Sequence, residues 1–176
     1  ANDDDVPGGL IGPWLVDYFH GRFVPATGRK LKSAHVSRET IKQIKHYFNR
    51  QLSDFKVPLD LTGYSPALVK WLSVLATVPF GDVITYKEFA QRWGNIKAAR
   101  AAGQACRRNP LPIIIPCHRI VQVDRKFDNY SGGDKTNPRN RNNIKRKQWL
   151  IDLESKPIWS SSYSFAQRNH YLSSTS

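Results

Sequence analysis

Residues 109–119 read Asn-Pro-Leu-Pro-Ile-Ile-Ile-Pro-Cys-His-Arg, and they place Cys117 beside His118 at the end of a short apolar run. Three consecutive isoleucines are typical of a buried β-strand, which Pro116 would end. A thiol that follows a core strand is held on rigid backbone and can still face a pocket. Because the thiolate is the nucleophile, His118 or Arg119 beside it would favour the reactive form. The stretch therefore predicts a positioned cysteine nucleophile.

The two cysteines of the chain receive opposite interpretations. A lone cysteine is most often an inert core residue, and Cys106 fits that role because alanines surround it on a predicted helix. Cys117 instead follows a basic helical segment. If Cys117 and His118 point to opposite sides of an extended segment, a bridging water would carry the proton between them. A carboxylate would then orient the imidazole, and Glu154 and Asp152 are both candidates.

The charge of the chain is high and unevenly distributed. Its 176 residues carry a formal net charge of +13, and residues 86–150 hold 15 Lys and Arg residues against four Asp and Glu residues. This concentration indicates a polyanionic partner, most simply a nucleic-acid backbone. Two cysteines without a C-x-x-C pair exclude a disulfide scaffold and give no sign of structural zinc, so we expect no metal and no cofactor.

The chain also lacks the features of an exported or membrane protein. No signal peptide opens it, and no apolar run approaches membrane-spanning length. We therefore expect a monomeric intracellular protein without a membrane partner. It would lie in the nucleus of a eukaryote or in the cytoplasm of a prokaryote.

Two amphipathic helices are predicted ahead of the basic region. The first has Ser37 as its N-cap, and its apolar face comprises Ile41, Ile44, Phe48 and Leu52. Ser65 and Pro66 begin the second, whose apolar stripe comprises Leu68, Trp71, Leu72 and Leu75. Stripes of this kind are core faces, so we assign the first helix and its surroundings to the scaffold.

A helix-turn-helix pattern follows. Thr85 can cap a short helix that begins with Tyr86, Gly94 interrupts it, and an alanine-rich helix runs over about 97–106. Taken singly, Tyr86 would be a core aromatic residue and Arg100 a solvated charge. If the helix pair entered DNA, Arg100 could fill the base stack and Tyr86 could contact a phosphate. An enzyme that acts on a base within a duplex must first extrude that base.

The last third of the chain mixes short elements with polar segments. We expect residues 121–127 to be extended and 129–133 to form a flexible loop. Residues 134–148 are rich in Asn, Lys and Arg and have little power to form a core. They would either contact phosphates or form a solvated loop, and we favour the contacts. A final apolar helix would begin at Trp149 and carry Glu154.

Five segments together resemble the O6-alkylguanine-DNA alkyltransferases, also called methylated-DNA–protein-cysteine methyltransferases. They agree in order and spacing over roughly residues 64–154, with weaker similarity at Tyr47-Phe48 and Pro58-Leu59-Asp60-Leu61. The segments are Pro79-Phe80-Gly81-Asp82-Val83-Ile84-Thr85-Tyr86, Ala99-Arg100-Ala101-Ala102-Gly103, Asn109-Pro110 through Pro116-Cys117-His118-Arg119, Tyr130-Ser131-Gly132-Gly133, and Trp149-Leu150 through Glu154.

The resemblance implies a two-subdomain α/β fold. Residues 1–63 would form an α/β, ribonuclease-H-like scaffold domain. Residues 64–155 would form a mainly helical domain for DNA binding and alkyl transfer, which contains the helix-turn-helix. Residues 156–176 would be a C-terminal tail.

The resemblance also implies a stoichiometric repair reaction on double-stranded DNA. Cys117 would take an alkyl group from O6 of guanine, or from O4 of thymine, and the resulting thioether would leave the protein spent after one event. His118 would deprotonate the cysteine through a water, with Glu154 behind it. Tyr86 would help rotate the nucleotide out of the duplex and donate a proton as guanine leaves.

Further residues receive roles in binding from the same resemblance. Arg100 would occupy the vacated place in the base stack. The DNA contacts would come from Arg100, Tyr86, Ala99, Gly103 and Arg107. The substrate pocket would comprise Tyr130, Ser131, Ile120 and Asn109, of which Asn109 would also brace the turn before the cysteine.

Two alternative functions share part of this pattern. A DNA-binding regulator with an incidental cysteine would fit the helix-turn-helix and the charge, and a cysteine hydrolase would fit Cys117 and His118.

The chain also departs from the family, which often has glycines where Arg125 and Asp128 stand here. That departure predicts a stiffer or narrower loop beside the pocket.

Overall fold

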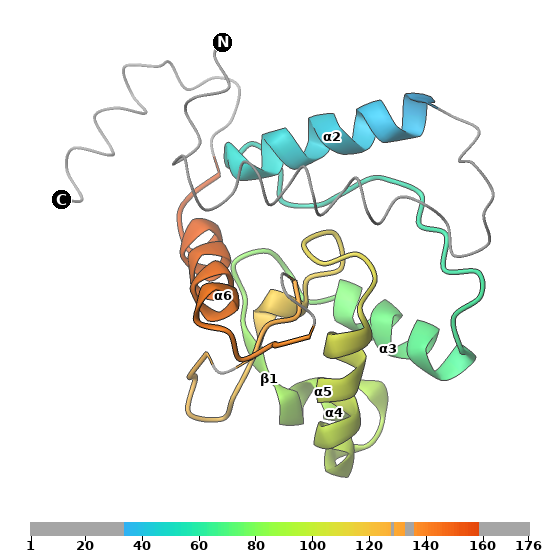
Figure 1. Cartoon of the computed structure of the whole chain (residues 1–176), viewed down its shortest axis with the longest axis vertical. Helices are drawn as coiled ribbons and strands as arrows, with labels where there is room; N and C mark the ends of the chain where they lie inside the picture. The colour runs from blue at the N-terminus through green and yellow to red at the C-terminus, as the bar shows by residue number, and fades with distance from the viewer. Residues whose placement is uncertain (1–33, 128, 133–135, 159–176) are drawn as a thin grey trace, which may run out of the picture.

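The computed structural model describes residues 34–127, 129–132 and 136–158, with side chains from residue 38 onward. Its helices are α2 (Ala34–Phe48), α3 (Pro66–Ala76), α4 (Tyr86–Trp93), α5 (Ala99–Arg108) and α6 (Arg141–Glu154) (Figure 1). Two short 3-10 turns, η2 (Ile96–Ala98) and η3 (Cys117–Arg119), and two short strands complete the described elements. The expectations for residues 1–33, for Asp128, for residues 133–135 and for the tail beyond residue 158 lie outside this part of the chain. No described helix is long and apolar enough to cross a membrane.

The two strands bring distant parts of the chain together. β1 (Ile84–Thr85) and β2 (Ile120–Val121) pair in parallel, with Ile84 opposite Ile120 and Thr85 opposite Val121. Tyr86 begins α4 directly after β1, and η3 ends directly before β2. This small sheet therefore places Tyr86 near the cysteine segment.

The residues predicted to begin α3 and to begin and end α4 are confirmed in these roles. The Ser65 side chain accepts a hydrogen bond from the Leu68 amide at 3.3 Å, as an N-cap does. Thr85 and Glu88 form a reciprocal capping box, with hydrogen bonds of 3.1 and 2.6 Å. Gly94 ends α4 with a φ of 118°, a conformation that favours glycine. These residues fix where each helix begins or ends.

One core lies beneath these helices. All four residues of the predicted α3 stripe are buried. Trp71 from this stripe stacks on Trp93 of α4 at 4.6 Å between ring centroids, and its ring also meets the Phe89 ring edge-on. Tyr47 from α2 and Leu150 from α6 belong to the same cluster of buried residues. The core therefore joins α2 and α6 to the helices that follow residue 65.

The isoleucine run does not form the predicted strand. Ile113 has a φ of 77° and lies in a turn, although Ile113 and Ile115 are fully buried as expected. The turn is closed by Asn109, whose amide group donates to the Ile115 carbonyl at 2.7 Å and accepts from the Leu111 amide at 3.0 Å. A side chain thus supplies the bonds that a strand partner would otherwise make.

Two helix boundaries also differ from the predictions. α2 begins at Ala34 rather than at Ser37, and its buried face holds Thr40, Ile44 and Tyr47 while Ile41 is 52% exposed. α6 begins at Arg141 rather than at Trp149, with the Asn140 side chain accepting from the Asn142 amide at 2.8 Å. The polar start of α6 is nevertheless anchored, because buried polar residues on it have hydrogen-bond partners. Asn143 bonds the Asn137 carbonyl at 3.2 Å, and fully buried Lys147 bonds the Asn129 carbonyl at 3.1 Å.

Candidate active site

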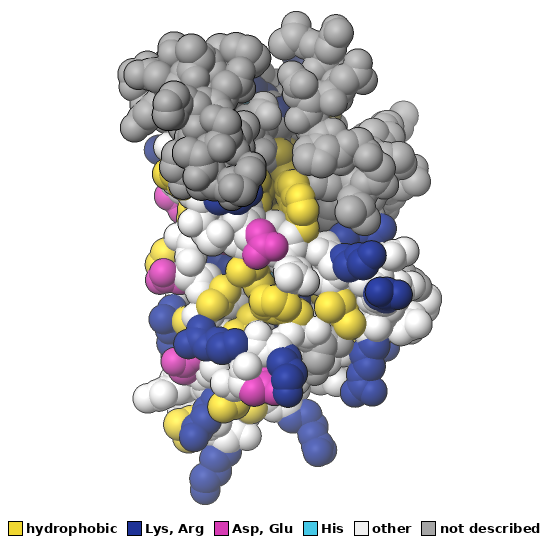
Figure 2. Space-filling model, turned by 90° about the vertical axis from the view of Figure 1, so that its left-hand side faces the viewer, with side chains coloured by type: hydrophobic (Ala, Val, Ile, Leu, Met, Phe, Trp, Pro, Cys, Tyr) yellow, Lys and Arg dark blue, Asp and Glu magenta, His cyan; other side chains and the backbone are white. Residues whose placement is uncertain are grey.

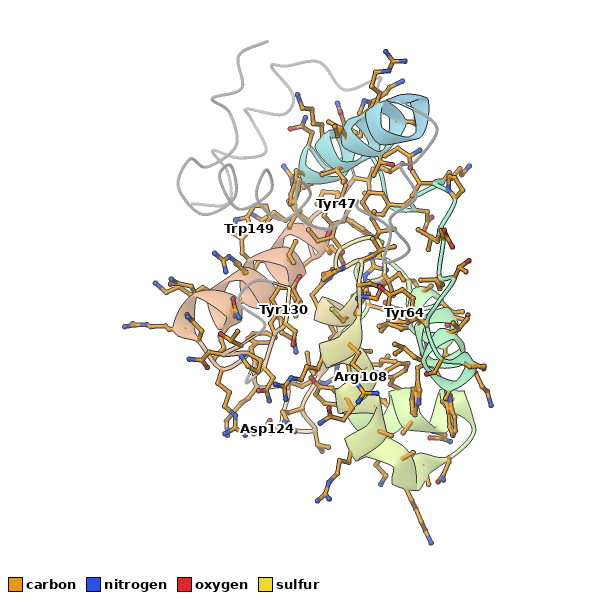
Figure 3. The ribbon with its side chains drawn as sticks, turned by 45° about the vertical axis from the view of Figure 1, so that its right-hand side comes forward. Tyr47, Tyr64, Arg108, Asp124, Tyr130 and Trp149 are labelled. Atoms are coloured by element: carbon orange, nitrogen blue, oxygen red, sulfur yellow. The ribbon has the colours of Figure 1, made fainter. Side chains whose placement is uncertain are left out.

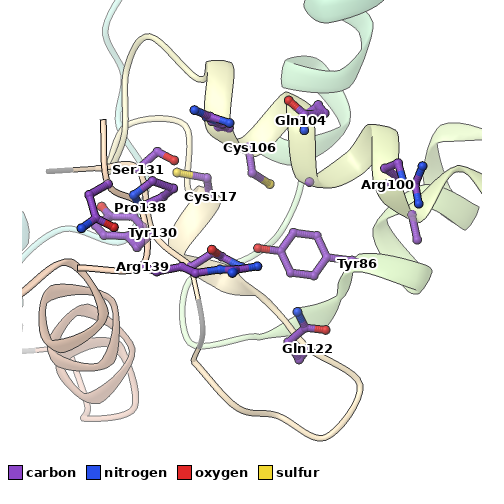
Figure 4. A pocket seen from close by; sticks show the side chains of 15 residues that line it. Tyr86, Arg100, Gln104, Cys106, Cys117, Gln122, Tyr130, Ser131, Pro138 and Arg139 are labelled. Carbon is purple, nitrogen blue, oxygen red and sulfur yellow. The ribbon is translucent and has the colours of Figure 1, made fainter. Parts of the chain in front are cut away.

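Cys117 lines a cavity of about 520 Å³ between α5 and the segments around Tyr130 and Pro138 (Figure 4). Its thiol is buried, and it begins η3 rather than following a strand. Tyr86 lines the cavity from the start of α4, and Arg100 and Arg107 line it from α5. The cavity is therefore a hollow with a sulfur atom inside and arginines around it.

His118 follows Cys117 in η3. Its Nε2 atom is 2.7 Å from Oε1 of Glu154, and both side chains are buried. Nδ1 of His118 is also buried and has no hydrogen-bond partner among the described residues. Asp152, the other candidate carboxylate, is exposed. The imidazole is thus oriented by Glu154 through one nitrogen, and the other nitrogen can serve the thiol.

The Glu154 carboxylate is held by several donors. Tyr47, which reaches it from α2, donates from its hydroxyl to Oε1 at 2.6 Å. Arg119 donates from Nε to Oε2 at 2.8 Å and from Nη2 to Oε1 at 3.0 Å. The Gly81 amide adds a bond of 3.4 Å to Oε2. A carboxylate with so many donors is fixed in both charge and position.

The pKa shifts in this group agree with that arrangement. Burial alone would raise the pKa of Glu154, but the neighbouring His118 and Arg119 outweigh it and hold the pKa well below its usual value. Burial lowers the pKa of His118, against the opposing effect of Glu154. Burial, followed by the charge of Glu154, raises the pKa of Tyr47. At neutral pH the site therefore holds an ionised carboxylate, a neutral imidazole and a protonated phenol, and the imidazole can act as a base.

Tyr86 and the α5 residues face one another across a short distance. Tyr86 is half-buried, and a side-chain carbon placed at Gly103 would lie 3.9 Å from its ring. Arg100 and Arg107 are exposed, and Ala99 lines the cavity with them. The structure therefore brings the predicted DNA-binding residues together at the rim of the cavity that contains the thiol.

The predicted pocket residues fall into two groups. Tyr130 and Ser131 are buried and line the cavity. Gly132 beside them has no room for a side chain, because its Cβ would lie 2.1 Å from Cζ of Tyr130. Asn109 and Ile120 are buried outside the cavity wall, where Asn109 closes the turn and Ile120 pairs in β2.

Several residues of the site were not predicted from the sequence. The sequence gives Tyr47 only a weak family similarity, and it predicts that Arg139 and Lys147 belong to a polar segment with little power to form a core. Cys106, assigned to packing, is buried but also lines the cavity, and burial followed by the nearby Cys117 raises its pKa. The Cys106 thiol therefore stays protonated at neutral pH.

The loop after β2 carries the predicted departure from the family. Arg125 has a φ of 61°, in the left-handed region that favours glycine. Its guanidinium donates to the Val83 carbonyl at 3.0 Å, so the loop is tied to the segment before β1. The arginine at position 125 thus tethers the loop to the segment before β1.

A buried thiol, the imidazole next to it in the chain and a fixed carboxylate lie under a rim of arginines, which is the arrangement expected of a cysteine nucleophile at a basic surface. The family model for the DNA-binding domain of 6-O-methylguanine DNA methyltransferase matches residues 69–156. The chain belongs to this family, that of the methylated-DNA–protein-cysteine methyltransferases.

Individual relatives agree with the family assignment. A methylated-DNA–protein-cysteine methyltransferase of Mycobacterium leprae is 35% identical over 123 residues, which are 70% of this chain and 68% of that protein. A crystal structure of Mycobacterium tuberculosis O6-methylguanine methyltransferase is similar with a TM-score of 0.57 at 36% identity, over 67% of this chain and 65% of that one. A crystal structure of Mycobacterium tuberculosis OGT in complex with DNA has the same TM-score and identity, over 66% and 64%. The chain spans about two thirds of the length of these relatives.

Proposed function

We propose that this protein repairs DNA by transferring an alkyl group from O6 of guanine to the sulfur of Cys117, once per protein molecule. The observation that carries the proposal is the position of Cys117 inside the cavity and next to His118, whose imidazole is bonded to Glu154 at 2.7 Å. A cysteine with a base and an orienting carboxylate has the arrangement of an activated nucleophile. The family of the chain supplies the substrate class.

The proposed reaction is an in-line displacement. The Cys117 thiol gives its proton through a water to Nδ1 of His118, and ionised Glu154 stabilises the imidazolium. The thiolate then attacks the alkyl carbon, so that the S–C bond forms while the C–O6 bond breaks and its electron pair passes to guanine. Tyr86 donates a proton to the departing guanine and recovers one from His118 through solvent. A thioether is a poor leaving group, so the alkyl group stays on Cys117 and the protein is spent.

The DNA contacts belong to the same proposal. We assign α4 and α5 to a helix-turn-helix, with Arg100 replacing the extruded nucleotide in the base stack. On the face shown in Figure 2, Lys and Arg side chains project from the lower half of the molecule, at the height of α4 and α5 in Figure 1. The solved complex of a relative with DNA supports a nucleic-acid partner. Residues 1–63 would act as a scaffold domain, which α2 joins to the site through Tyr47.

A titration tests the proposed stoichiometry. Duplex DNA with O6-methylguanine is incubated in excess with known amounts of protein, and restored guanine is counted by chromatography. One equivalent of guanine per protein is expected, and Cys117→Ala should yield none while it still binds the duplex. More than one equivalent would indicate a turnover enzyme instead. No restored guanine despite tight binding would favour the DNA-binding regulator.

A further inference from the structure

We propose that Arg139 is a binding residue for a backbone phosphate next to the extruded nucleotide. This inference rests on the proposed function and adds a contact from the segment that precedes α6. Arg139 lies on the opposite side of the cavity from α5 (Figure 4). A guanidinium can bind a phosphate with two parallel hydrogen bonds, a geometry that a phosphodiester accepts well.

The charge around the cavity favours an anion. Arg100 and Arg107 line it from α5 and Arg139 lines it from the other side, and no Asp or Glu is among the described residues that line it. O6-Alkylguanine is a neutral base, so its recognition does not require three cations. The nucleotide that carries the base brings negatively charged phosphates, and these match the cations.

Arg139 is presented by a backbone turn that is held in place. The Pro138 carbonyl accepts from the Tyr130 amide at 3.0 Å, which ties the turn to the wall of the cavity. The Asn137 carbonyl accepts from the Asn140 amide at 3.0 Å and from the Asn143 side chain at 3.2 Å. The turn is thereby fixed both to the cavity and to the first turn of α6. A cation on such a support has less conformational entropy to lose on binding.

A base and the DNA backbone would bind at different depths in this cavity. Tyr130 and Ser131 are buried, whereas Arg139 is exposed at the opening. In Figure 4 the Arg139 side chain extends from the Pro138 side toward Tyr86. A base that enters far enough to meet Cys117 leaves its sugar and phosphates at the opening. Arg139 is therefore placed for a phosphate rather than for the base.

Rates of alkyl transfer from three substrates test this inference. The substrates are a duplex with O6-methylguanine, the same duplex with neutral methylphosphonates on both sides of the lesion, and free O6-benzylguanine. Arg139→Ala is compared with Arg139→Lys, which keeps the charge but not the planar fork. Arg141→Ala is the matched control, because it removes an exposed arginine two positions away that does not line the cavity.

On the ordinary duplex, Arg139→Ala should transfer about tenfold more slowly than the wild type at limiting protein, and Arg139→Lys should lie between them. On the methylphosphonate duplex the difference should disappear, because the partner of Arg139 has lost its charge. The slope of log affinity against log salt should also fall by roughly 0.9 in Arg139→Ala. When the ordinary duplex is replaced by the methylphosphonate duplex, Arg141→Ala should lose rate by the same factor as the wild type.

An equal loss with both duplexes, or no loss with either, would overturn the inference. A loss of the same size with free O6-benzylguanine would show that Arg139 shapes the base pocket instead. Failure of the wild type to react with any of the substrates would contradict the proposed function rather than the role of Arg139. The three substrates thus separate the two proposals.

Discussion

The hydroxyl of Tyr47 donates a 2.6 Å hydrogen bond to the carboxylate of Glu154, although 107 residues separate the two in the sequence. The same hydroxyl oxygen lies 3.5 Å from Nε2 of His118. The Tyr47 ring is packed among Phe48, Phe55 and Phe80. α2 therefore contributes directly to the position of the Glu154 carboxylate.

Tyr47→Phe should weaken both the stability of the protein and its reaction. Loss of a bond to a buried ionised group should lower the free energy of unfolding by roughly 1.5–3 kcal/mol, measured by urea denaturation. Without this donor, the negative charge of Glu154 is less compensated and stabilises protonated His118 more strongly. The pKa of His118 should therefore rise. The acid limb of the transfer rate should therefore move to higher pH, which a purely structural role would not cause.

Tyr64→Phe is the control for this experiment. Tyr64 is half-buried beside α3 and lies away from Tyr47 in Figure 3. Its substitution also removes one hydroxyl, and the pH profile should stay that of the wild type. If Tyr47→Phe kept the wild-type profile as well, the hydroxyl would have no role in positioning Glu154.

The pH dependence of transfer follows from the neutral imidazole. Burial lowers the pKa of His118 from its usual 6.5, so the base stays available as pH falls from 8 to 6.5. Transfer to free O6-benzylguanine, measured by stopped assays at each pH, should fall only below pH 6.5. A fall that is complete above pH 7 would contradict a neutral, buried base.

Stability should change with pH in the same sense. Because the pKa of His118 is lower in the folded protein, the unfolded chain binds more protons below pH 6.5, and folding weakens there. Glu154 also has a lowered pKa, so its contribution is present above its usual 4.5 and is lost as pH falls further. The free energy of unfolding should therefore decline in two steps on acidification.

Gly132→Ala should disturb the pocket through Tyr130. The new Cβ would lie 2.1 Å from Cζ of Tyr130, so the ring must move. We expect the free energy of unfolding to fall by roughly 1–3 kcal/mol and transfer to slow with both duplex and free base. In a Tyr130→Ala background the same substitution should cost little. An equal cost in both backgrounds would place the strain elsewhere.

Arg100→Ala should slow repair of duplex DNA about tenfold more than the reaction with free O6-benzylguanine. Only the duplex has a vacated place in the stack, and unstacking costs a few kcal/mol. Arg92→Ala removes an exposed arginine from α4 outside the cavity wall and serves as the control. Single-turnover rates on the two substrates provide the comparison. Equal losses of rate on both substrates would contradict the proposed place of Arg100 in the base stack.

The elements that sequence predicts well here are those with local signals. Ser65, Thr85 and Gly94 cap or end helices through bonds within a few residues, and the α3 stripe follows from its spacing. The isoleucine run failed as a strand because the Asn109 side chain closes a turn around it. The apolar composition of the run predicts that these residues are buried, but it does not predict the path of their backbone.

The residues of the candidate site also divide into those that the sequence predicts and those that it does not. The pairing of His118 with Glu154 follows from the resemblance and is present at 2.7 Å, while the catalytic roles of these two residues and of Cys117 stay predictions. Tyr47 could not be given its role, since its bond spans 107 residues. The polar composition around Lys147 predicts a segment with little power to form a core, yet Lys147 is fully buried and donates to the Asn129 carbonyl. Polarity alone does not reveal a buried cation that has a distant partner.

The central claim, that Cys117 is the alkyl acceptor, is tested most directly by weighing its peptide. Trypsin cleaves after Arg100, Arg107, Arg108 and Arg119, so residues 109–119 carry Cys117 and residues 101–107 carry Cys106. After incubation with a duplex that contains O6-methylguanine, the peptide 109–119 should gain the mass of one methylene unit on Cys117, and 101–107 should not change. An unmodified 109–119 peptide, with the methyl group still on the DNA or on Cys106, would contradict the account.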